Sequence, residues 1–134
     1  MCKTRSVFSL ISIIISQIFS AMQIFARSVV KQQRWDEAIA VYQQLLTTYP
    51  HAQHVAYCGW GQVLVQQGKL AEAITIYNKV IAFRPQDSEA HYLLGMALQQ
   101  QQKLPAAKAA FQKALQFDPQ HQAARQSLKQ IDRQ

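Results

Sequence analysis

The sequence is poor in cysteine, glycine, proline and acidic side chains, with two Cys, four Gly, four Pro and seven Asp or Glu among 134 residues. Two cysteines, Cys2 and Cys58, are too few for a disulfide framework, and the sequence has no Cys-x-x-Cys pair. The glycines form neither a phosphate-binding loop nor the turn that carries a hydrolase nucleophile. The sequence therefore indicates neither a disulfide-stabilised scaffold nor a nucleotide-binding enzyme.

Residues that bind metals or act as catalytic bases are equally sparse. His51 and His54 have a spacing that metal sites use, but no third ligand follows at a suitable distance. Cys58 has no obvious base beside it, so we expect it to be a small residue on a helix face. We predict no catalytic residue, no metal and no cofactor, and therefore a non-enzymatic protein.

Basic side chains outnumber acidic ones, although charged residues are a small fraction of the sequence. Fourteen Lys and Arg against seven Asp and Glu give a net charge of +7, yet only 16% of residues are charged, and glutamine occurs 22 times. A basic surface that binds nucleic acid or anionic lipid is one alternative, since lysines and arginines gather between Lys103 and Arg133. These residues are not interleaved with exposed aromatics and show no base-reading motif, which argues against nucleic acid.

An internal repeat of constant period organises the chain between His54 and Pro119. Residues of similar type recur at one and the same spacing: Gly61 and Gly95, Ala73 and Ala107, Tyr77 and Phe111, Pro85 and Pro119. Within each unit the apolar positions follow spacings of three and four, which place them on one face of a helix. Gly68 stands where the first helix of its unit should end, and the prolines stand where the second helices end. Each unit is therefore predicted to be a helical hairpin that must stack on its neighbours.

These residues resemble the tetratricopeptide repeat, in which two helices meet at small residues beside an aromatic side chain. His91, at a position where the pattern has a large apolar residue, is the clear departure. The resemblance implies an all-α solenoid of about three helical hairpins plus a capping helix, preceded by a hydrophobic helix. The expected divisions are a hydrophobic segment 1–26, repeats 19–52, 54–87 and 88–121, and a cap 122–134.

The amino-terminal segment differs from the rest, because the run from Val7 to Ala26 contains no charged side chain. A helix of this length is about 30 Å long, the thickness of a bilayer core. Three interpretations remain open: a single-pass membrane anchor, a cleaved signal peptide of an exported protein, and an amphipathic helix that packs on protein or lies in a membrane interface. Five polar residues form one stripe along it: Ser9, Ser12, Ser16, Ser20 and Gln23.

The anchor overlaps the first repeat, because counting back from Pro50 begins that repeat at Phe19. The pattern residues of its first helix are then Met22, Phe25, Ala26 and Val29. Cleavage after Ala26 would remove most of this helix and expose Ala38, Tyr42 and Leu45. We therefore expect the segment to be retained as a membrane anchor, continuous with the first repeat helix from about residue 7 to residue 32.

The resemblance also implies a function, since the first helices of such hairpins line a concave groove that binds a protein or peptide. Carried over, the expected groove residues are Arg27, Lys31, Cys58, Gln62, Gln66, Tyr92, Met96 and Gln100. Some family members clamp the terminal carboxylate of a peptide with Lys, Asn and Arg, but the matching positions here hold Gln23, Arg27, Gly59, Glu89 and Leu93. The resemblance thus implies a neutral, amide-rich groove without that clamp, in a membrane-tethered interaction module or assembly scaffold.

Overall fold

The computed structural model describes residues 2–31 and 34–134, and within them the chain is helical and contains no strand. In chain order the elements are α1 (Cys2–Lys31), α2 (Trp35–Thr48), the short 3-10 helix η1 (Pro50–Ala52), α3 (Gln53–Gln66), α4 (Leu70–Phe83), α5 (Ser88–Gln100), α6 (Leu104–Phe117) and α7 (Gln122–Asp132). The expected all-α solenoid is confirmed.

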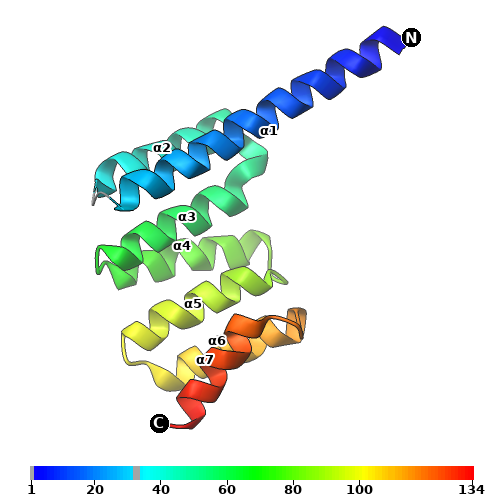
Figure 1. Ribbon diagram of the computed structural model, residues 1–134. Helices are drawn as coiled ribbons and strands as arrows, with labels where there is room; N and C mark the ends of the chain where they lie inside the picture. Colours follow the sequence, from blue (N-terminus) through cyan, green and yellow to red (C-terminus); the bar gives the residue numbers. More distant parts are fainter. Residues whose placement is uncertain (1, 32–33) are drawn as a thin grey trace.

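Figure 1 shows the helices stacked as successive antiparallel pairs, with the two termini at opposite ends of the stack. We call α1 and α2 hairpin 1, α3 and α4 hairpin 2, and α5 and α6 hairpin 3; α7 packs on α6 as the cap. Contacts run between neighbours in this order, as expected for a solenoid. The amino-terminal half of α1 extends beyond the other helices (Figure 1). α1 runs from residue 2 to residue 31 without interruption, while the expected end at residue 32 lies outside the described residues.

Close contacts between glycine and an aromatic ring hold hairpins 2 and 3 together. A Cβ atom on Gly61 would lie 2.4 Å from Tyr77 Cε1, and one on Gly95 would lie 2.6 Å from Phe111 Cε1. Both rings are almost fully buried, with 1% and 0% of their surfaces exposed. Only a residue without a side chain lets the paired helices approach this closely, which explains why the two glycines recur at the repeat spacing.

The turns inside hairpins 2 and 3 share a left-handed residue. Gly68 has φ of 79°, and Gln102, at the equivalent position of the next repeat, has φ of 63°. In both turns the next amide reaches back to the preceding helix, from Lys69 N to Leu64 O at 2.9 Å and from Lys103 N to Leu98 O at 3.0 Å. Gly68 therefore ends α3 as the sequence predicts, whereas Gln102 makes the same turn with a side chain that disfavours it.

His91, the departure from the repeat pattern, is buried and has a polar partner. Its Nε2 atom donates to the carbonyl oxygen of Pro85 at 2.9 Å. Its ring packs against Phe117, with a centroid separation of 5.4 Å. The position thus keeps its core role, because the histidine satisfies its ring nitrogen on the backbone of the preceding turn.

Hairpin 1 follows the repeat pattern with one exception. Ala26, Ala38 and Leu45 are fully buried, and Met22 packs against the same cluster, but Phe25 is 53% exposed instead of buried. The equivalent residues Trp60 and Leu94 pack against the hairpin that precedes each of them. Because no described hairpin precedes α1, Phe25 has nothing to pack against. The Val29 side chain lies outside the described residues.

Candidate functional site

A groove runs along one side of the stack, across α1, α3 and α5, and contains three adjoining cavities. The first, of about 240 Å³, is lined by Arg27, Lys31, Tyr42, Gly59, Gln62, Val63 and Gln66. The second, of about 140 Å³, is lined by Gln23, Arg27, Tyr42, His54, Val55, Cys58, Gly59 and Gln62. The third, of about 380 Å³, is lined by Gln62, Val65, Gln66, Tyr77, Glu89, Tyr92, Leu93, Met96 and Gln100. Gln62 lines all three, so the cavities form one continuous surface.

All eight groove residues expected from the sequence line these cavities. Arg27 and Lys31 stand at the α1 end, the Gln62 and Gln66 amides stand in the middle, and Gln100 stands at the α5 end. Cys58 contributes to the second cavity, and Tyr92 and Met96 to the third. The structure thus brings them together on one surface; binding by them remains a prediction.

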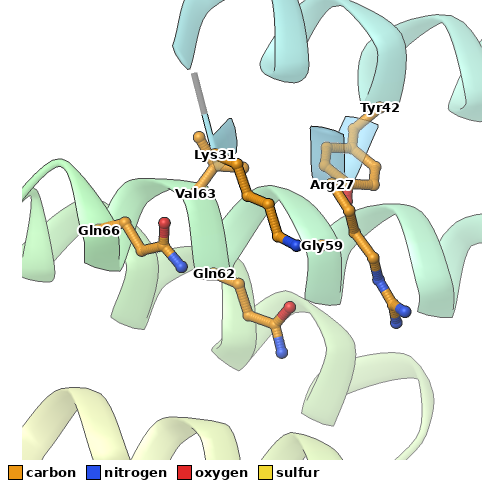
Figure 2. Close-up of a pocket in the computed structure, with 7 residues that line it drawn as sticks. All are labelled: Arg27, Lys31, Tyr42, Gly59, Gln62, Val63 and Gln66. Atoms are coloured by element: carbon orange, nitrogen blue, oxygen red, sulfur yellow. The ribbon is translucent and has the colours of Figure 1, made fainter. Parts of the chain in front are cut away.

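The α1 end of the groove is basic (Figure 2). Arg27 and Lys31 are exposed and extend from α1 toward α3, where Gln62 and Gln66 present their amides. Tyr42 is buried beneath them, next to Gly59, where a Cβ atom would lie 2.3 Å from Tyr42 Cε1. Burial raises the pKa of Tyr42, and the positive charge of Arg27 partly lowers it. The ring stays neutral, and the cavity presents two cations above an aromatic floor.

Cys58 lies on the groove but is buried, since only 8% of its surface is exposed. Burial raises the pKa of its thiol to about 12, and the carboxylates of Asp87 and Glu89 act in the same direction, while Arg84 opposes them. A reactive cysteine needs a lowered pKa, so this thiol is not an activated nucleophile. It acts as a small packing residue, as the sequence indicates.

The α5 end of the groove is built from residues that also support the fold. Tyr92 packs against Phe111 and His121, with ring centroids 5.9 Å and 4.8 Å away. Met96 receives a weak contact from Ser127 Oγ of the cap at 3.8 Å. Because Tyr92 packs against Phe111 and His121, its substitution would disturb folding as well as the groove. The glutamines are therefore better probes of the groove.

Two histidine–carboxylate contacts lie at the edges of the groove and join successive repeats. His54 Nε2 lies 2.7 Å from Asp87 Oδ2, although the atoms are not aligned as a hydrogen bond. Asp87 also caps α5 by accepting from Ala90 N at 2.9 Å. His121 Nε2 donates to Glu89 Oε2 at 3.1 Å and thereby ties the cap to α5. Sequence reasoning gave these histidines no partners, because their carboxylates lie about one repeat away in the chain.

Sequence reasoning also placed Tyr42 only in the core of hairpin 1. Its ring reaches the groove because Gly59 on the next helix leaves space above it. The sequence signal for this contact is an aromatic residue in one repeat, Tyr42, combined with a glycine on the facing helix of the next repeat, Gly59.

The described helices form a solenoid of helical hairpins with a groove along α1, α3 and α5. Three family models match the chain: a tetratricopeptide repeat model covers residues 21–56, another covers 88–121, and a model described as TPR repeat covers 61–102. The chain belongs to the tetratricopeptide repeat family.

Solved structures share this fold. The first TPR domain of Spaghetti (RPAP3), bound to the HSP90 peptide SRMEEVD, is 24% identical, with a TM-score of 0.71 over 84% of this chain and 89% of that one. The second TPR domain of human RPAP3, in complex with the HSP70 peptide SGPTIEEVD, is 21% identical, with a TM-score of 0.69 over 83% and 92%. The Sgt2 TPR domain from Aspergillus fumigatus is 19% identical, with a TM-score of 0.74 over 85% and 76%. No curated protein matches the chain significantly.

Proposed function

We propose that the protein is a non-enzymatic interaction module whose groove binds an extended segment of a partner protein. The observation that carries this proposal is the continuity of the three cavities along α1, α3 and α5. Gln62 and Gln66 stand in its middle, and amide groups can both donate to and accept from an extended peptide backbone. The peptide-bound structures of similar fold support this use of the surface.

The groove favours a peptide with an acidic side chain at one end and an apolar one at the other. Arg27 and Lys31 supply positive charge at the α1 end, while Tyr92 and Met96 offer adaptable apolar contact at the α5 end. Glu89 borders the α5 end and disfavours a second acidic group there. This distribution differs from a carboxylate clamp, so we expect little affinity for peptides that end in a run of acidic residues.

The test is a peptide array screened with the full-length protein, followed by affinity measurement for the selected peptide. Gln62→Ala combined with Gln66→Ala should weaken binding about tenfold, since two hydrogen bonds at about 0.5–1.5 kcal/mol each are lost. The matched control is Gln112→Ala combined with Gln116→Ala, two exposed glutamines of α6 that line none of the three cavities. Equal affinity of both double variants would contradict the groove proposal.

We propose further that α1 attaches this module to a membrane. Among the described residues, Ser9–Ser28 is the one helical stretch that is long and apolar enough to cross a bilayer, and almost none of it is buried in the protein. A signal sequence would pass the same test, which leaves an exported soluble protein as the alternative. Retention is favoured because Ala26 is fully buried in the core of hairpin 1.

The intact mass of the natural protein, measured separately in membrane and soluble fractions, distinguishes these alternatives. A full-length mass in the membrane fraction supports attachment through α1. A soluble product shortened near Ala26 would contradict it, and would also withdraw the proposed repeat 19–52. The other proposed units, 54–87 and 88–121 with the cap 122–134, do not depend on this result.

A further inference from the structure

The apolar surface of this protein is concentrated on α1. Between Leu10 and Phe25, eight large apolar side chains are 42–67% exposed. On the described surface only one other large apolar residue, Phe83, is exposed to a similar degree. Four of them, Ile11, Ile14, Ile18 and Phe25, follow spacings of three, four and seven and form one apolar stripe along α1. Single exposed apolar residues are ordinary, but a contiguous surface of this kind indicates a contact site.

The stripe lies at the α1 end of the solenoid, which no other described element covers. At the opposite end α7 turns Ala124 and Ile131 inward and keeps Arg125 and Lys129 exposed, so that end is polar. Phe25 is the α1 equivalent of Trp60 and Leu94. Those two residues pack against the preceding hairpin, whereas Phe25 is exposed. A solenoid normally closes both ends with polar surface. The exposed apolar side chains at the α1 end therefore form a surface that a partner can cover.

A transverse membrane span does not fit the folded hairpin 1. Ala26 is fully buried against α2, and Phe19 and Met22 pack against the same cluster. The part of the apolar run that precedes these contacts, Val7 to Ile18, is only about 18 Å long, against about 30 Å for a bilayer core. Spanning would place either the repeat residues or Lys3 and Arg5 inside the hydrocarbon.

Accepting the membrane attachment proposed above, we propose that α1 lies along the membrane surface with its apolar stripe immersed. This orientation covers the stripe over both the projecting half and the packed half of α1 while hairpin 1 stays folded. Leu10 and Ile15 flank the stripe, and Ile13 lies about 60° beyond Leu10. At about 100° per residue, the apolar arc of the projecting half is therefore about 200° wide. A partner helix covers a narrower seam, so this breadth favours a lipid surface over a second copy of the chain.

The polar face of α1 indicates which forces would bind this helix to a membrane. Ser9, Ser16 and Ser20 lie opposite the stripe and are exposed, and α1 contains no acidic residue. Interfacial helices that rely on anionic lipid carry lysine and arginine along the polar face. Here the polar face carries serine from Ser9 to Ser20, and its basic residues Arg27 and Lys31 lie only near the carboxyl end of α1. Binding should therefore come from insertion of apolar side chains into gaps between lipids, and should favour strongly curved, loosely packed membranes over flat ones.

The experiment is flotation of the full-length protein with phosphatidylcholine vesicles, comparing small sonicated with large extruded preparations at low and high salt. We expect stronger binding to the small vesicles at both salt concentrations. Ile14→Gln combined with Ile18→Gln should reduce binding at least about tenfold. The matched control, Ser9→Gln combined with Ser20→Gln on the polar face, should retain it. Equal binding to small and large vesicles, or binding that disappears at high salt, would overturn the proposal.

Topology is tested on the vesicle-bound protein with a membrane-impermeant thiol reagent. Cys58 is buried and its thiol pKa is raised, so Cys2 is the site to follow. Labelling of Cys2 from outside, with release of the protein by alkaline carbonate, supports an interfacial helix. Protection of Cys2 with resistance to carbonate would overturn this orientation while leaving membrane attachment intact. No vesicle binding, with a dimeric mass in solution, would overturn the attachment itself and assign the stripe to a second copy.

Discussion

Substitution of Gly61 by alanine tests whether close helix approach determines the stability of this solenoid. The new Cβ atom would lie 2.4 Å from Tyr77 Cε1 and 2.7 Å from Tyr77 Cζ, both well inside van der Waals contact. The Tyr77 ring is 1% exposed and belongs to the core cluster shared by α3, α4 and α5. The ring cannot swing into solvent, so the helices must move apart or the ring must tilt.

Two opposing effects determine the magnitude. Overpacking a core by one methyl group costs about 1–3 kcal/mol, while replacing glycine by alanine inside a helix gains about 1 kcal/mol. Because the clashing atoms belong to an enclosed ring, we expect a net loss of about 1–2 kcal/mol and a melting temperature several degrees lower. Gly61→Leu or Gly95→Leu adds three further heavy atoms to the same space and should prevent folding.

Urea denaturation followed by circular dichroism measures the free energy of unfolding. The informative comparison is a double-mutant cycle in which Gly61→Ala is also made with Tyr77→Leu, which removes the clashing ring. In that background the alanine should be neutral or stabilising, because only the helix gain remains. If Gly61→Ala alone raised the free energy of unfolding by about 1 kcal/mol, helix propensity would dominate and the close-approach argument would be wrong.

Three further outcomes are expected from denaturation measurements. Gln102→Gly should stabilise the protein by up to about 1 kcal/mol, because φ of 63° disfavours a side chain, although glycine also loosens the unfolded chain. Asp87→Ala should destabilise it by about 1–2 kcal/mol, since Ala90 N loses its 2.9 Å cap and His54 loses its carboxylate. The native state holds the Cys58 proton more tightly than the unfolded state, because the thiol pKa is raised from 9.0 to about 12. The protonated thiol therefore contributes its full stabilisation of the folded state below pH 9.0, and this contribution is lost as the pH rises toward 12. In Cys58→Ala, the free energy of unfolding should fall less steeply with pH over this range.

The stacked architecture was predictable because every determinant recurs at a fixed distance. Gly61 and Tyr77 have the same separation in sequence as Gly95 and Phe111, so two copies of one contact could be read directly. A helical face shows itself in spacings of three and four, and these are local properties of the chain. The set of groove residues followed from the same register, and the structure places them along one surface.

The contacts between repeats could not be predicted from the sequence in the same way. His54 meets Asp87 and His121 meets Glu89 across almost a full repeat, and no local spacing encodes such pairs. Tyr92 was predicted only as a ligand contact, because its packing against His121 depends on where α7 lies. Tyr42 reaches the groove only because Gly59 on the next helix opens the space above it. Each of these depends on tertiary geometry that a pattern of residue types does not contain.

The first repeat shows most clearly where local patterns conflict. The hydropathy of Ser9–Ser28 predicts that this stretch is removed from water. The repeat pattern predicts that Met22 and Ala26, in the same helix, pack against α2. An interfacial α1 satisfies both, because the apolar stripe and the groove residue Arg27 lie on opposite sides of it. The groove would then begin about one helix diameter, roughly 10 Å, from the lipid surface. Membrane contact would also cover Phe25, stabilise hairpin 1 and order the basic end of the groove, so that peptide affinity should rise when the protein is bound to vesicles.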